Sequence, residues 1–225
     1  MNFMTSAESS RVGVAILARA PIAGQAKTRL IPALGAEGAA RLQRWLLQRT
    51  VAMALVADVG PVTLWCAGDP HHPDFALCCA DGAVTMRSQP EGDLGQRMRV
   101  AMVESATPDG TLVIGADCPA LTANHMRQAA DRLRHRATLI YPAEDGGYVL
   151  IGMREPHPHV LEAAFEGVDW GTDRVMVQTR QRLQARGCTW DEAATLWDVD
   201  RPEDLPRLWA LCPDAERVVS CEASA

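Results

Sequence analysis

The stretch Val12-Gly-Val-Ala-Ile-Leu17, followed closely by Ala20-Pro-Ile-Ala-Gly-Gln-Ala-Lys-Thr-Arg-Leu30, decides the fold. The first part is a short apolar run, which predicts a buried strand. The second part contains Pro21 and Gly24 and predicts a loop. Apolar residues at helical spacing then predict a long helix over residues 35–58. A strand, a polar loop and a helix in this order form the unit from which parallel sheets are built.

The same alternation continues along the rest of the chain. Further strands are predicted over residues 61–67, 83–88, 111–116, 137–141 and 148–153, with a last strand ending at Asp198-Val-Asp200. Helices are predicted over residues 94–106, from a Thr122 cap to Arg134, from a Thr172 cap to Gly187, and after Pro202. This order predicts an α/β fold, a Rossmann-like and mostly parallel sheet with helices on both faces. We expect one domain over residues 1–211 and a loosely ordered tail over residues 212–225.

The composition is that of a globular protein, with 48% hydrophobic residues, 22% charged residues and a net charge of -6. This acidic balance argues against non-specific binding to nucleic acid or to a membrane surface. The longest apolar run is far shorter than the roughly 20 residues of a bilayer span. Because the first eleven residues carry no export signal, we expect a cytoplasmic protein. Seven cysteines without a Cys-x-x-Cys pair indicate reduced thiols rather than a metal or redox site.

The loop after the first strand is the strongest candidate for phosphate binding. Gly24 lets the backbone approach an anion closely, and Lys27 and Arg29 place two cations within three residues. Lys27 is also the only lysine among 22 basic residues, which suggests that its position needs a compact ammonium. The loop is not a P-loop, because it lacks the Gly-Lys-Ser/Thr ending. An ordinary solvated loop remains the alternative.

Three aspartates are candidates for binding a divalent cation. Asp117 directly follows the strand predicted over residues 111–116, where the carboxyl end of a strand would present it to a ligand. Asp198 and Asp200 are two residues apart near the end of the last predicted strand, so their side chains would point the same way. Carboxylates are the ligands that Mg²⁺ prefers, together with water and phosphate oxygens. Helix capping is the alternative for Asp117 and Asp200.

Two acidic, glycine-containing loops and one tryptophan complete the set of candidates. Asp93 lies in Glu91-Gly-Asp-Leu-Gly95 and is free to accept hydrogen bonds from a base or ribose. Asp145 lies in Glu144-Asp-Gly-Gly147 between two predicted strands, although a plain turn explains this motif equally well. Trp170 stands between an acidic loop and the Thr172 cap, and it could either form the wall of a pocket or lie in the core.

Five motifs in this order resemble those of a known group of small bacterial transferases. The motifs are Ala-Pro-x-x-Gly-x-x-Lys-Thr-Arg-Leu from Ala20, Gly-Asp-Leu-Gly from Gly92, Gly-Ala-Asp-Cys-Pro from Gly115, Pro-Ala-Glu-Asp-Gly-Gly-Tyr from Pro142, and Asp-Val-Asp-x-Pro-Glu-Asp-Leu from Asp198. The group has the GT-A, nucleotide-diphospho-sugar transferase fold, and some members are labelled arsenosugar-biosynthesis glycosyltransferases. The resemblance covers residues 12–210. More distantly, the chain is similar to the 2-phospho-L-lactate guanylyltransferase family.

The resemblance implies roles for individual residues. By position, Lys27 and Arg29 would bind the phosphates of the donor, and Asp117, Asp198 and Asp200 would hold Mg²⁺ or Mn²⁺. The loop of Asp145, Gly146 and Gly147 would face the acceptor, with Trp170 as a further wall. The sequence departs from the guanylyltransferase pattern after Gly147, where Tyr148-Val149 replaces Thr-Asn, which argues against a phospholactate-like acceptor.

These residues favour nucleotidyl transfer from a nucleoside triphosphate to a small, phosphorylated acceptor with release of pyrophosphate. Such a reaction needs neutralisation of charge, for which Lys27, Arg29 and Asp117 with its metal are the candidate catalytic groups. Glycosyl transfer from a nucleotide-sugar is the first alternative, although Pro119 stands where an Asp-x-Asp motif would place its second carboxylate. A nucleotide-binding module without catalysis is the second alternative. The base, the acceptor and the oligomeric state stay open.

Overall fold

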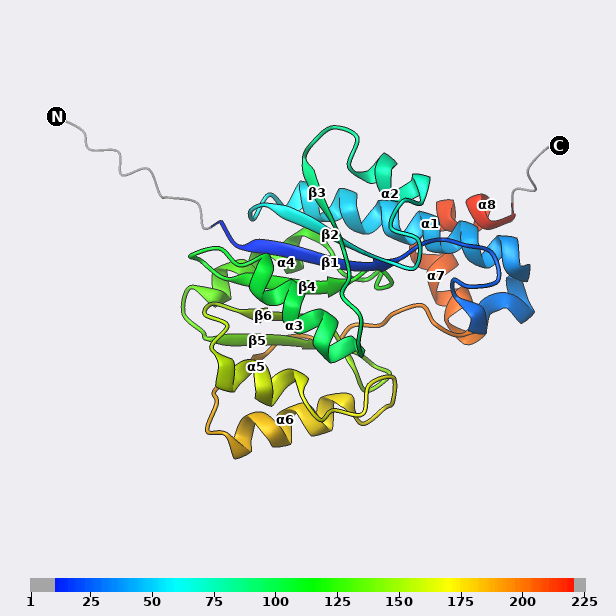
Figure 1. Ribbon diagram of the computed structural model, residues 1–225. Helices are drawn as coiled ribbons and strands as arrows, with labels where there is room; N and C mark the ends of the chain where they lie inside the picture. The colour runs from blue at the N-terminus through cyan, green and yellow to red at the C-terminus, as the bar shows by residue number, and fades with distance from the viewer. Residues whose placement is uncertain (1–10, 221–225) are drawn as a thin grey trace.

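The computed structural model describes residues 11–220, which form one seven-stranded sheet in the order β3-β2-β1-β4-β6-β5-β7 (Figure 1). In chain order the strands are β1 (Gly13–Arg19), β2 (Val62–Ala67), β3 (Val84–Ser88), β4 (Thr111–Gly115), β5 (Thr138–Pro142), β6 (Tyr148–Met153) and β7 (Asp191–Glu192). Strand β6 is antiparallel to its neighbours β4 and β5, and the other pairings are parallel. The predicted fold class, a mixed and mostly parallel α/β sheet, is confirmed.

Helices cover both faces of the sheet. In chain order they are α1 (Ile31–Ala57), α2 (Pro73–Cys78), α3 (Leu94–Glu104), α4 (Ala123–Leu133), α5 (Pro158–Phe165), α6 (Val175–Ala185), α7 (Leu205–Leu211) and α8 (Pro213–Ser220). One face packs against α1 and α4 and the opposite face against α3, α5 and α6 (Figure 1). Within residues 11–220, no helix combines the length and the apolar character that crossing a bilayer requires.

Strand β1 lies at the centre of the sheet because its side chains are apolar on both faces. Val14 and Ile16 point into the core beneath α1 and α4, whereas Ala15 points into the core beneath α3 and α5. A strand buried on both faces shows a continuous apolar run, which is the pattern of residues 12–17. The chain leaves β1 toward β2 and β3 and then returns to β4 on the other side of β1. The strand order therefore reverses between β1 and β4.

Helix α1 starts earlier than its apolar pattern predicts. It begins at Ile31 with Pro32 in its first turn, and it contains a non-helical residue at Gly35, where φ is 69° and ψ is 167°. A glycine tolerates this positive φ at no steric cost. Residues 31–34, before Gly35, form a short helical segment that directly follows the loop of Lys27.

Two elements near the end of the chain differ from the sequence-based prediction. The last strand, β7, consists of Asp191 and Glu192 alone, so Asp198 and Asp200 do not lie on a strand. The backbone N–H of Val199 instead donates to the Asp117 carbonyl at 2.9 Å, which ties this irregular segment to the end of β4. Helix α6 starts at Val175, and Thr172 donates to the Asp169 carbonyl within the preceding turn rather than capping the helix. The Thr122 cap of α4 is present as predicted.

Residues 213–220, which the sequence suggested to be loosely ordered, form helix α8 packed against α1. Ala215 and Val219 are buried in a core that they share with Leu42 and Leu46 of α1. The Trp45 indole N–H donates to Asp214 at 2.9 Å. The expectation of a loose tail is therefore wrong as far as Ser220, because a small apolar face on α8 has a partner that periodicity alone does not reveal. Residues 221–225 lie outside the described range.

Candidate functional site

A cleft of about 640 Å³ opens at the carboxyl ends of β1 and β4, where the strand order reverses. Open α/β sheets bind their ligands at such a reversal. Most residues singled out in the sequence line this cleft, namely Lys27, Arg29, Asp117, Asp145, Gly147, Trp170, Asp198 and Asp200. The cleft thus brings together side chains from five separate segments of the chain.

Lys27 is held at the floor of the cleft by two contacts. Its ammonium Nζ donates to the Val199 carbonyl at 2.6 Å and lies 3.4 Å from Asp117 Oδ2. The side chain is only 7% exposed. Its backbone has a φ of 46°, the left-handed conformation that non-glycine residues rarely adopt. The loop therefore directs this one ammonium inward, toward the end of β4.

Carboxylates outnumber cations around Lys27. The pKa of Asp198 is raised to about 7, first by burial and then by the nearby carboxylates of Asp117 and Asp145, while Lys27 partly offsets these effects. We call Lys27, Asp117, Asp145 and Asp198 the charged centre. No three acidic, histidine or cysteine side chains between residues 11 and 220 are arranged as a ready-made metal site. The charged centre therefore combines three carboxyl groups with a single ammonium.

Asp200 does not join the charged centre. Its carboxylate forms an ion pair with the Arg29 guanidinium, and its backbone N–H donates to Asp204 Oδ2 at 2.9 Å. Of the three predicted metal ligands, Asp117 and Asp198 therefore lie at the charged centre, whereas Asp200 pairs with Arg29. Residues 198–200 belong to no strand, so the alternation of side chains on which the prediction depended does not apply to them.

The loop between β5 and β6 presents Asp145 to the cleft. Asp145 Oδ1 accepts a hydrogen bond from the Gly147 N–H at 2.9 Å. Gly146 has a φ of 92°, and a Cβ there would come within 2.1 Å of the Asp173 carbonyl oxygen. The residue must therefore be glycine for structural reasons, and it does not itself line the cleft. Glu144 anchors the loop to α7 through two hydrogen bonds from Arg207, at 2.7 and 3.1 Å.

Two other predicted nucleotide-binding residues lie outside the lining of the cleft. Gly24 has a φ of 78° and nothing near its missing side chain, so it allows the turn that leads to Lys27. Asp93 is the N-cap of α3, where its Oδ1 accepts from the Gln96 N–H at 2.8 Å. The Gln96 side chain accepts from the Asp93 N–H in return, which completes a capping box. The structure thus gives Asp93 a structural function.

Sequence reasoning missed Gln89, which lines the cleft at the ends of β1, β2 and β3. Its side-chain amide donates to the carbonyls of Ala18 at 3.1 Å and Trp65 at 2.9 Å. These bonds occupy both amide hydrogens and fix the direction of the amide oxygen, which is left as an acceptor. The available signal was a glutamine placed directly after a predicted strand.

Residues 50–172 match the bacterial family described as "Uncharacterized protein conserved in bacteria (DUF2064)". The chain belongs to the DUF2064 family. No curated protein matches the sequence significantly.

Several solved structures share the fold. A protein of Desulfovibrio desulfuricans G20, provisionally named a nucleotide-diphospho-sugar transferase, aligns with a TM-score of 0.77 and 23% identity over 93% of this chain and 97% of the other. A cytidylyltransferase of Leptospira borgpetersenii aligns with a TM-score of 0.58 and 12% identity over 96% and 99%. CMP:2-keto-3-deoxy-manno-octonic acid synthetase complexed with CTP aligns with a TM-score of 0.55 and 13% identity over 91% and 99%. At these identities the likeness establishes the fold alone.

Proposed function

We propose that this DUF2064 protein is a metal-dependent nucleotidyltransferase that uses a nucleoside triphosphate and a small, phosphorylated acceptor. The observation that carries this proposal is the buried Lys27 ammonium, held 3.4 Å from Asp117 at the reversal point of the sheet. Nucleotidyl transfer depends on positioning and on stabilising negative charge rather than on covalent chemistry of the protein. A fixed cation beside clustered carboxylates meets that need. The resemblance in fold to a cytidylyltransferase supports the proposal.

The charged centre suits a hard divalent cation. Asp117 is close enough to Asp198 to disfavour the ionised form of Asp198, and a dication between the two carboxylates would remove that repulsion. Mg²⁺ characteristically takes one or two protein carboxylates and completes its shell with water and phosphate oxygens. The pair therefore fits Mg²⁺ or Mn²⁺, although residues 11–220 contain no preformed set of three ligands. When bound, the metal would neutralise charge on the triphosphate.

In the proposed reaction, an oxygen of the acceptor phosphate forms a bond to the α-phosphorus of the triphosphate. The bond from that phosphorus to the oxygen bridging it to the β-phosphorus breaks, and pyrophosphate leaves with the electron pair. Lys27 stabilises the negative charge that develops during this displacement, because its ammonium is already desolvated and oriented. Arg29, which is 60% exposed at the rim, binds the departing phosphates after exchanging its partner Asp200.

Release of pyrophosphate tests the proposal directly. The protein is incubated with each of the four nucleoside triphosphates, Mg²⁺ and a panel of sugar phosphates, and pyrophosphate and the nucleotide product are quantified. We expect pyrophosphate and a nucleoside diphosphate-linked product that both depend on the acceptor. Matched reactions with UDP- or GDP-sugars test glycosyl transfer, which the resemblance to the Desulfovibrio protein keeps as the second candidate. A free nucleoside diphosphate without pyrophosphate would replace our proposal with that candidate.

A further inference from the structure

One end of the cleft contains buried polar atoms that have no partner. Within residues 11–220, five buried side-chain polar atoms lack a hydrogen bond, and two of them, Tyr148 Oη and Trp170 Nε1, belong to residues that line the cleft. We call these two residues the aromatic corner. Their rings pack edge to face with centroids 6.2 Å apart. Leaving one buried polar group unbonded costs about 1–3 kcal/mol.

Aromatic donors elsewhere in the fold do have partners. The only other tyrosine, Tyr141 on the adjacent strand β5, donates to the His125 carbonyl at 3.3 Å. The indole N–H of Trp65 donates to Ser105 Oγ at 3.0 Å, and that of Trp190 donates to Glu192 at 2.8 Å. The protein therefore provides acceptors for these three aromatic donors, but not for the pair at the cleft.

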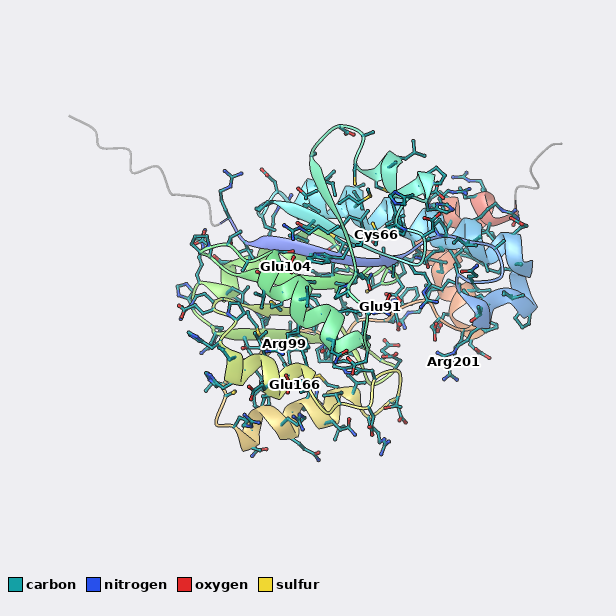
Figure 2. The ribbon with its side chains drawn as sticks, viewed as in Figure 1. Cys66, Glu91, Arg99, Glu104, Glu166 and Arg201 are labelled. Atoms are coloured by element: carbon teal, nitrogen blue, oxygen red, sulfur yellow. The ribbon has the colours of Figure 1, made fainter. Side chains whose placement is uncertain are left out.

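The turn that carries Trp170 is well fixed. Asp169 Oδ2 accepts from Arg174 at 2.7 Å and from Gln178 at 2.9 Å, and the Trp170 N–H donates to the Val168 carbonyl at 2.9 Å. Figure 2 shows Arg99 of α3 beside Glu166 at the start of this turn, and their ion pair measures 3.1 Å. The missing hydrogen bonds are therefore not explained by a loosely held segment.

The Trp170 indole packs against Gly95 of α3, where any larger residue would collide with it. We call this contact the Gly95 notch. A Cβ on Gly95 would come 2.5 Å from Trp170 Nε1. Both donor atoms are closed to solvent in this position. Burial also raises the pKa of the Tyr148 phenol, which keeps its hydroxyl protonated and able to donate. The corner thus offers two uncharged donors between aromatic surfaces, a combination that suits the oxygens of an uncharged ring rather than a phosphate.

We propose that the aromatic corner recognises the acceptor, whose uncharged, hydroxylated ring of the sugar type accepts hydrogen bonds from Tyr148 Oη and Trp170 Nε1. This inference rests on the proposed function and specifies its substrate class. Binding turns the indole out of the Gly95 notch, so that both donors reach the ring. The acceptor's phosphate then points toward the charged centre, where Lys27 and Asp117 lie.

The test uses the two tyrosines as a matched pair. Hexose 1-phosphates are the probes, glycerol 3-phosphate is the ringless control, and the variants are Tyr148→Phe and Tyr141→Phe. We expect Tyr148→Phe to raise KM for the hexose 1-phosphate about tenfold and to leave triphosphate affinity unchanged. Its Tm should rise by about 2–4 °C, because the variant removes a buried hydroxyl that has no partner. Tyr141→Phe removes a satisfied hydroxyl, so its Tm falls by about 2–4 °C and KM stays constant. The inference is wrong if both variants lose Tm equally, if KM for Tyr148→Phe is unchanged, or if glycerol 3-phosphate is used equally well.

Tryptophan fluorescence separates a failure of this inference from a failure of the proposed function. Titration of the wild-type protein with a hexose 1-phosphate should change its emission, and Trp170→Phe should abolish the change while Trp65→Phe keeps it. A fluorescence response without pyrophosphate release would refute nucleotidyl transfer and leave the corner as a sugar site. Pyrophosphate release in which Trp170→Phe retains the fluorescence change would refute the corner and leave nucleotidyl transfer in place.

Discussion

At the charged centre, Lys27 is already bonded to Asp117 and to a backbone carbonyl, whereas at the aromatic corner Tyr148 and Trp170 carry donors without partners. The charged centre lacks positive charge, and the aromatic corner lacks hydrogen-bond acceptors. The centre has three carboxylates around one ammonium and therefore has excess negative charge, while the corner has hydrogen-bond donors without acceptors. This difference matches the two proposals, a cation and phosphate at the centre and the neutral oxygens of the acceptor at the corner.

The largest effect should come from the ammonium at the centre. We expect Lys27→Ala to lower kcat by about 10²–10³ because the preorganised positive charge beside Asp117 is lost. Lys27→Arg should also lose most activity, because a planar guanidinium does not fit a buried contact of 2.6 Å to the Val199 carbonyl. Steady-state pyrophosphate release measures both variants. Wild-type rates in Lys27→Arg would show that charge alone suffices and that the tight geometry is unimportant.

Burial of Asp198, together with its neighbouring carboxylates, should destabilise the charged centre in a pH-dependent way. The pKa of Asp198 rises from 3.8 to about 7 on folding, so the folded protein loses stability as pH increases through that window. Asp198→Asn removes this loss and should raise the free energy of unfolding by about 2 kcal/mol at pH 8, after allowance for solvent screening. The gain should shrink toward zero near pH 4. Urea denaturation in the presence of a chelator measures both values, and an equal gain at both pH values would contradict the electrostatic cause.

The smallest effect on stability is expected at the rim. Arg29 and Asp200 pair there with side chains that are 60% and 35% exposed. Exposed pairs contribute about 0–1 kcal/mol, so Arg29→Ala should barely change the unfolding midpoint. The same variant should raise KM for the triphosphate several-fold, because Arg29 is the proposed rim ligand of its phosphates. Asp200→Asn serves as the control, since it frees Arg29 and should not raise KM. An unchanged KM in Arg29→Ala would remove Arg29 from the binding site.

The sequence predicts local features of this molecule better than features that depend on distant packing. The α/β fold follows from apolar runs such as residues 12–17, whose burial on both faces is visible in the pattern itself. Asp117 lies where predicted because its position depends only on the end of β4. The segment around Asp198 does not form the predicted strand. Its position is fixed by the hydrogen bond from Val199 to Asp117, two residues more than eighty positions apart in the sequence.

The aromatic corner illustrates what the sequence does not reveal. Tyr148 follows the double glycine and Trp170 precedes α6, but nothing local shows that their rings meet or that their polar atoms stay unbonded. That property arises from the fit of the turn at 166–174 against Gly95 of α3. Gln89 is an intermediate case, because its place after a strand was visible while the two carbonyls that orient its amide were not.

Because the chain has a single lysine, amine-directed chemistry has one side-chain target, and that target lies at the floor of the cleft. Acylating reagents can reach Lys27 only when its contacts with Asp117 and Val199 open. The labelling rate of Lys27, followed by mass spectrometry, would therefore report how often these contacts open. It would also report protection by any bound compound without requiring knowledge of the reaction.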